Sequence, residues 1–162
     1  MDMRFSVSTQ TFYADGINFG DTLPADAIEL IADQELPIYE AVNAGCYIYM
    51  KDGTLTISEP RPDNYYSWDE DKCSWVMTAQ AIEQKKQDAL NVAAEEKQQL
   101  IDQANDYMNG KQWPGKAAIG RLKGEELELY GLWLDYLDAL EMVDTTSAPD
   151  IDWPILPEGA AI

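Results

Sequence analysis

The stretch EPRPDNYYSWDEDK, residues 59–72, decides the fold, because the composition of the chain changes across it. The sequence before it is rich in β-branched and aromatic residues, and the sequence after it is rich in Ala, Gln, Glu and Lys. Clustered prolines are typical of a connection between elements. We therefore predict an α+β chain with a small β-rich domain at 1–60, a linker at 61–73 and a helical domain at 74–162.

The β-rich domain contains the clearest local signal of the chain, CYIYMKDGTLTISEP at 46–60. Two β-rich runs flank a Lys-Asp-Gly turn, which predicts a hairpin with Gly53 at a positive φ. Tyr47 and Tyr49 fall on one face of its first strand, because side chains alternate along a strand. Residues 3–30 are predicted to form short strands and turns.

A short helix is predicted over ADQELPIYEAVNAG, residues 32–45. Leu36, Tyr39 and Val42 recur at a spacing of three residues and would form one apolar face.

The second half of the chain is predicted to be helical. A long helix is expected over about 74–109 and a second helix over about 125–143, with a break at WPGKAAIG, 113–120, between them. The first has a thin, Ala-rich apolar seam, so it needs a partner or forms a coiled-coil-like stalk. The second has two apolar stripes, which predicts burial on two sides. The stripes are Leu127, Tyr130, Leu134 and Leu137, and Leu129, Trp133, Tyr136, Leu140 and Val143.

The chain is strongly acidic, with 30 acidic and 11 basic residues and a formal net charge of −19. It has no basic patch for a phosphate backbone, so we expect no nucleic-acid partner. The acids are dispersed, which favours a role in solubility and in suppressing self-association. An acidic inhibitor or nucleic-acid mimic that binds a basic host protein is the alternative that this charge leaves open.

Catalytic and metal-binding motifs are missing from the sequence. The chain has no histidine, no Cys spacing for zinc, and no glycine-rich phosphate loop. The acidic run at 69–71 is more typical of a solvated connector than of a calcium loop. A carboxylate pair of the glycosidase type is the one catalytic arrangement that composition leaves open. We therefore predict no enzyme, no cofactor and no metal.

The sequence has no feature of a secreted or membrane protein. The N-terminal ten residues lack the basic start and apolar core of a signal peptide, and no apolar run approaches the ~20 residues of a membrane span. Cys46 and Cys73 are expected to be free thiols in a reducing compartment. We expect synthesis in the cytoplasm and no membrane partner.

Aromatic residues are the best candidates for a functional surface, because Trp and Tyr dominate interface hot spots. Tyr47, Tyr49, Tyr65, Tyr66 and Trp68 form either a binding face or the core of a β domain that is short of Leu and Val. The residues alone leave both interpretations open. An exposed edge strand of the hairpin would also permit pairing with another chain.

The C-terminal sequence LWLDYLDALEMVDTTSAPDIDWPILPEG, 132–159, resembles the signature of bacteriophage tail-fibre assembly proteins of the Mu and lambda type. That signature is a helix with W-x-x-Y-x-x-A-L, an Asp-Ser/Thr-Ala-Pro connection, and I-x-W-P-x-x-P. The residues that match it are Trp133, Tyr136, Ala139, Leu140, Asp144, Ala148, Pro149, Ile151, Trp153, Pro154 and Pro157. TFYADG at 11–16, LPADAIEL at 23–30 and the predicted hairpin also resemble the family, although Thr11 replaces a family glycine.

The resemblance implies a chaperone and not an enzyme. It implies that the N-terminal domain binds the C-terminal tip of the trimeric receptor-binding tail fibre, and that the helical domain promotes fibre folding and trimerisation in the host cytoplasm. Some members of the family stay on the mature fibre. The fibre-binding candidates are Phe12, Tyr13, Tyr47, Tyr49, Tyr65, Tyr66 and Trp68. Self-association is left open, from monomer to trimer.

The predicted tail at 144–162 is extended, because its prolines exclude a helix. We expect Trp153 to fold back onto the helix that carries Trp133 and Tyr136. A tail that reaches a neighbouring subunit or the fibre is the alternative.

Overall fold

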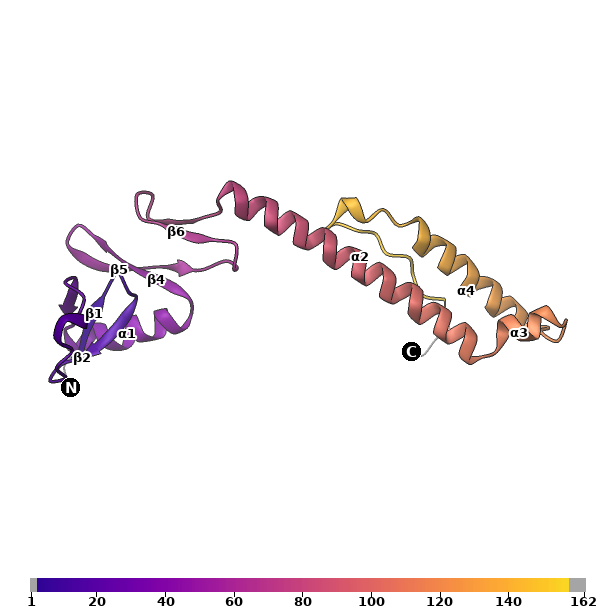
Figure 1. Cartoon of the computed structure of the whole chain (residues 1–162), viewed down its shortest axis with the longest axis horizontal. Helices are drawn as coiled ribbons and strands as arrows, with labels where there is room; N and C mark the ends of the chain where they lie inside the picture. The colour runs from indigo at the N-terminus through magenta and orange to yellow at the C-terminus, as the bar shows by residue number, and fades with distance from the viewer. Residues whose placement is uncertain (1–2, 158–162) are drawn as a thin grey trace. The chain divides into compact units, whose positions relative to one another are not determined.

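The computed structural model describes residues 3–157 of the chain. It divides into two compact units, unit 1 at Met1–Ile82 and unit 2 at Glu83–Ile162. Unit 1 contains all the strands of the described residues and unit 2 is helical, which confirms the predicted α+β class (Figure 1). The last part of the predicted tail, 158–162, lies outside the described residues.

Unit 1 begins with a three-stranded antiparallel sheet in the order β2-β1-β3. Its strands are β1 (Met3–Ser6), β2 (Thr11–Ala14) and β3 (Ala27–Glu29), with the short 3-10 helix η1 (Gly20–Thr22) before β3. The helix α1 (Ala32–Asn43) and a hairpin complete its core. The buried residues of that core are Phe5, Leu30, Ile38, Ala41 and Ile48.

A carboxylate fixes the turn that joins β1 to β2. The hydroxyl of Ser6, which is fully buried, donates to Asp26 Oδ1 over 2.8 Å. The backbone N–H of Ser8 donates to Asp26 Oδ2 over 2.7 Å. The Ser8 N–H bond is the main reason why the pKa of Asp26 lies below its ordinary value. Asp26, immediately before β3, thereby ties the β1 end to β3.

Helix α1 buries other residues than those of the apolar face that its spacing predicted. Ile38 and Ala41 are buried, whereas Leu36 is 62% exposed and Tyr39 is 58% exposed. Of the three residues that the spacing assigns to one apolar face, only Val42 packs against the core. The helix meets the core of unit 1 through Ile38 and Ala41. Sequence spacing alone does not reveal which apolar face a helix buries.

The predicted hairpin is confirmed. It consists of β4 (Cys46–Lys51) and β5 (Thr54–Pro60), with Lys51 opposite Thr54. Asp52 and Gly53 have φ values of 51° and 78°. Two consecutive positive φ values are typical of the type I′ turn, whose twist matches that of the flanking strands.

A second hairpin occupies part of the segment that we predicted as a linker. It consists of β6 (Ser67–Asp69) and β7 (Ser74–Val76), and Trp68 lies opposite Trp75 across the pair. The prediction of a helix from residue 74 is therefore wrong by about one turn. The two indole rings, 5.4 Å apart between centroids, favour the strand pairing over a helical start.

Helix α2 (Ala79–Gly110) follows the second hairpin and continues into unit 2. The hydroxyl of Thr78 accepts a hydrogen bond from the backbone N–H of Ala81 over 3.1 Å, which caps the start of the helix. The predicted break at 113–120 is in fact the short helix α3 (Trp113–Ala118). Pro114 does not prevent it, because a proline is tolerated in the first helical turn.

Unit 2 pairs α2 with α4 (Glu125–Met142), which runs alongside it in the opposite direction (Figure 1). The ring of Tyr107 on α2 stacks on Trp133 of α4 with centroids 4.3 Å apart. Lys97 on α2 donates to the carbonyl oxygens of Glu141 and Val143 over 2.7 and 2.8 Å. A lysine at this position satisfies free carbonyls at the end of α4 and complements its dipole.

The predicted burial of α4 on two sides is only half correct. Trp133, Tyr136 and Leu140 are buried, and Tyr130 and Leu137 of the other stripe pack against the same core, but Leu127 and Leu134 of that stripe are exposed. In the described residues, α2 and the tail cover one side of α4. The full core of unit 2 is Ala104, Met108, Trp113, Leu122, Trp133, Tyr136 and Leu140.

The described tail begins with the 3-10 helix η2 (Thr145–Ser147) and then runs extended beside α2 and α4 (Figure 1). Trp153 and Leu156 pack against the core of unit 2. This packing agrees with the expected fold-back of Trp153. Among the described residues, no helix joins enough length to enough apolar character to cross a membrane.

Replacing Asp26 by Asn should destabilise unit 1 at neutral pH, because the neutral amide has one acceptor oxygen where the carboxylate uses two charged ones. The lowered pKa means that the ionised carboxylate stabilises the fold above its ordinary value of 3.8. This contribution is lost as the pH falls through the folded-state pKa, so the difference between variant and wild type should shrink in acid. Urea denaturation of the wild type, of D26N and of the exposed control D21N, at neutral pH and in acid, measures these differences in stability. An equal effect of D26N and D21N at neutral pH would contradict the assignment.

Replacing Trp153 by Ala should lower the free energy of unfolding of unit 2 by about 2 kcal/mol, which is less than for a fully buried Trp because the ring stays partly exposed. Ile155 is the matched control, since its side chain is 92% exposed. I155A should leave stability unchanged. Chemical denaturation followed by tryptophan fluorescence and by circular dichroism compares them. A W153A protein as stable as I155A would show that the tail does not anchor unit 2.

Candidate functional site

The described residues offer surfaces on which a partner could bind. Within residues 3–157, no group of three or more His, Cys, Asp or Glu side chains could hold a metal ion. Both cysteines are free thiols. Burial raises the pKa of Cys46 above its ordinary value, with a smaller contribution from Glu59, so its reactive thiolate is disfavoured.

Three of the seven predicted fibre-binding residues, Tyr47, Tyr49 and Trp68, come together with Trp75. We call these four residues the aromatic cluster. Tyr47 stacks on Trp68 with centroids 4.8 Å apart, and Tyr49 lies 5.0 Å from the same indole. All four are partly buried, and burial chiefly raises the pKa of Tyr47. Much of this aromatic surface is therefore used to join the two hairpins.

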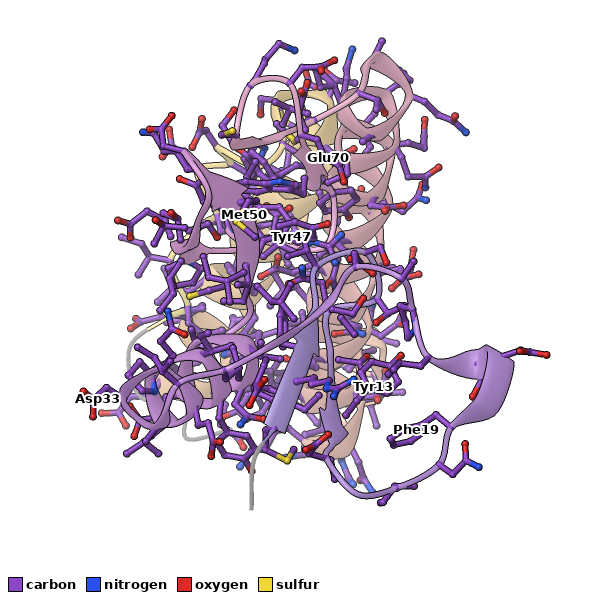
Figure 2. The ribbon with its side chains drawn as sticks, turned by 90° about the vertical axis from the view of Figure 1, so that its left-hand side faces the viewer. Tyr13, Phe19, Asp33, Tyr47, Met50 and Glu70 are labelled. Carbon is purple, nitrogen blue, oxygen red and sulfur yellow. The ribbon has the colours of Figure 1, made fainter. Side chains whose placement is uncertain are left out.

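The aromatic cluster still presents one open side. Its Tyr47 lies near Met50 of the first hairpin and Glu70 of the second, and the three line a shallow pocket of about 370 Å³ (Figure 2). Charge repulsion from Glu70 contributes to the raised pKa of Tyr47. This pocket is acidic as well as aromatic, because Asp71 also lines it.

Tyr65 and Tyr66 lie outside the aromatic cluster, in the loop before β6. Both are half-buried, and Arg61 holds their loop. The Arg61 guanidinium donates to the carbonyl oxygen of Tyr66 over 2.7 Å and lies 5.9 Å from the centre of the Trp75 ring. The loop is therefore fixed to the neighbouring hairpin through its backbone.

Phe12 and Tyr13 face opposite sides of the sheet, as neighbours on a strand must. The ring of Phe12 meets the buried Phe5 edge to face at 5.0 Å. Tyr13 instead contacts Phe19, with centroids 5.3 Å apart, on a loop that projects from the sheet (Figure 2). The seven predicted residues therefore do not form one continuous site.

Sequence reasoning missed an apolar groove between α1 and the sheet, which we call the α1 groove. It has a volume of about 390 Å³. Its lining residues are Met3, Phe12, Ala32, Glu35, Leu36 and Tyr39. Four of them have the helical spacing 32, 35, 36 and 39, which places them on one face of α1. The sequence signal was the shared helical face of Leu36 and Tyr39, but nothing in the sequence places that face beside Phe12.

The C-terminal residues that match the family signature mostly serve the fold of unit 2. Trp133, Tyr136 and Leu140 are core residues, and the tail covers them with Trp153. Asp144 accepts hydrogen bonds from the Thr146 hydroxyl over 2.7 Å and its N–H over 2.9 Å, and these bonds lower the pKa of Asp144. The remaining signature residues are placed as follows: Ile151 is half-buried, Pro149 is exposed, and Pro154 and Pro157 line a shallow pocket beside Leu132.

Comparison with known proteins gives this fold a family. The model of the family described as Caudovirales tail fibre assembly protein, lambda gpK, matches residues 25–158. In Escherichia coli strain K12, the uncharacterized protein YfdK is 72% identical over 71 residues, which are 44% of this chain and 49% of YfdK. TfaS is 33% identical over 112 residues, 69% of this chain and 90% of TfaS. The prophage tail fiber assembly protein homolog TfaE is 35% identical over 107 residues, 66% of this chain and 50% of TfaE.

The chain therefore spans about half the length of YfdK and of TfaE. No solved structure matches it. The family match nonetheless covers most of both units and includes the whole described tail. The chain belongs to the Caudovirales tail fibre assembly protein family.

Proposed function

We propose that this protein assists the assembly of a phage tail fibre. Unit 1 binds the C-terminal tip of the fibre, and unit 2 promotes the folding and trimerisation of the fibre chains. The observation that carries the proposal is the family match over residues 25–158, which takes in parts of both units. TfaE, one of the relatives, is named as a tail fiber assembly protein homolog.

The way in which a trimeric fibre folds supports the proposed roles of the two units. Chains that intertwine form contacts far apart in sequence, so they fold slowly and expose strand edges and apolar surface on the way. A partner that covers such surface must itself present apolar residues. Unit 1 does so in the α1 groove and in the aromatic cluster, and the net charge of −19 keeps such a protein soluble.

Unit 2 supplies a second apolar surface, on the side of α4 that the tail and α2 leave open. Leu127 and Leu134 are exposed there. A surface of this kind could bring together fibre chains or copies of this protein. The proposal places this activity in the host cytoplasm during phage assembly, with the protein free to stay on the finished fibre.

The net charge of −19 favours a second candidate, an acidic inhibitor that occupies the basic groove of a host protein. Such binding would weaken steeply as salt rises, because it depends on charges that salt screens. Binding to a fibre through apolar surface would depend much less on salt. The salt dependence of the first complex that is isolated therefore separates the two candidates.

Co-expression of the full chain with the C-terminal half of the tail fibre chain that is encoded beside it should yield a defined complex. Light scattering should give a mass that requires three fibre chains, because the proposal makes the fibre trimer the product. The same fibre expressed alone should be insoluble or fail to trimerise. A fibre that is soluble and trimeric by itself would count decisively against the proposal and would move the inhibitor to the front.

A further inference from the structure

The α1 groove combines two apolar residues that pack against the core, Met3 and Phe12, with two that the fold leaves exposed, Leu36 and Tyr39. Leu36 and Tyr39 are mostly exposed and together line one wall. Phe12, on the opposite side, rests on the core and lies 6.2 Å from Tyr39 between ring centroids. The groove therefore has a floor that the core holds rigid and a wall that is free to contact a partner.

The charge around this groove has one sign. Helix α1 carries Asp33, Glu35 and Glu40 and no basic residue. Glu35 lines the groove itself and makes no ion pair among the described residues. Figure 2 shows Asp33 at the outer edge of α1, away from Tyr13 and Phe19.

Three of the four basic residues of unit 1, Arg4, Arg61 and Lys72, are engaged away from Glu35. Arg4, on the strand next to Phe12, forms an ion pair with Asp15 over 3.1 Å. Arg4 also lies on the other face of β1 from Met3, which lines the groove. Lys72 pairs with Asp69 over 2.8 Å, and Arg61 is held by the loop before β6. An occupant of the α1 groove thus meets an apolar surface with an unpaired carboxylate at its side.

We propose that the α1 groove binds a segment of the tail fibre chain in which apolar side chains lie next to a lysine or an arginine. The apolar side chains enter between Phe12, Leu36 and Tyr39, and the basic group pairs with Glu35. This inference rests on the proposed function, because it takes the fibre as the partner. It adds which surface of unit 1 is used and which fibre chemistry fits there.

The groove is large enough for a few side chains of the partner but not for a whole interface. A volume of about 390 Å³ holds a few side chains, whereas a stable protein interface buries about 800 Å² on each partner. A few well-packed side chains supply most of the energy of such an interface. The α1 groove is the site of those contacts, and the rest of the interface surrounds it.

The first test measures binding of the full chain to the C-terminal half of the fibre by titration calorimetry. L36S and Y39S should each weaken the Kd by about tenfold, since each removes an anchor contact. Both side chains are mostly exposed, so circular dichroism should show an unchanged fold. I17S is the matched control, because Ile17 is 55% exposed and does not line the groove. Loss of binding in I17S with none in L36S would overturn the proposal.

The second test addresses charge. E35K should weaken the Kd by about tenfold, and E40K, which makes the same charge change on the same helix outside the groove, should have a much smaller effect. The difference should narrow as salt rises. Overlapping synthetic fibre peptides then identify the segment bound. A bound segment without a basic residue, or equal effects of E35K and E40K, would overturn the proposed chemistry.

The outcomes separate this inference from the proposed function. If the wild-type chain does not bind the fibre at all, the proposed function fails. If it binds and L36S, Y39S and E35K bind equally well, the function stands and the α1 groove is the wrong surface. If light scattering shows that the chain alone is a dimer that L36S converts to a monomer, a second copy occupies the groove and the inference is overturned.

Discussion

The stacking of Tyr107 on Trp133 is the contact on which unit 2 depends. Helix α2 has too few large apolar residues to be stable alone, and two of its three buried positions, Ala93 and Ala104, offer little area. The indole of Trp133, only 1% exposed, brings the apolar surface that α2 lacks. Lys97 then caps the end of α4 at the other end of the same pair. These contacts hold α4 against α2, and the tail then packs on the core that the two helices form.

Unit 1 also has few large aliphatic residues, and aromatic residues take their place. Its buried core is small, and the two hairpins are joined by aromatic rings and not by a layer of Leu and Val. Tyr47 and Trp68, which the sequence offers equally as a binding face or as packing, are largely used for packing. Binding surface is then found where the fold leaves apolar side chains free, on the outer face of α1 and at the open side of the aromatic cluster.

The sequence predicted those elements whose signals are local. The β4–β5 hairpin followed from a turn pair between two β-rich runs, and α4 followed from its long apolar pattern. The α1 groove was not predicted. An apolar stripe on a helix indicates that the helix makes a contact, but not whether the contact is with the core of the protein or with a partner. Residues 74–76 were predicted as helix because the partner of Trp75 lies across a hairpin, at Trp68. Cross-strand contacts of this kind leave no periodic signal.

The sequence by itself determined the α+β class, the hairpin, the two long helices and membership of a family, since each depends on composition, spacing or a linear motif. The tertiary structure decided which of two apolar faces is covered on α1 and on α4. Leu36 and Ile38 are both apolar, and the difference between a core residue and an exposed one depends on where the helix meets the sheet. That choice is set by the packing of segments far apart in sequence, which no local pattern records.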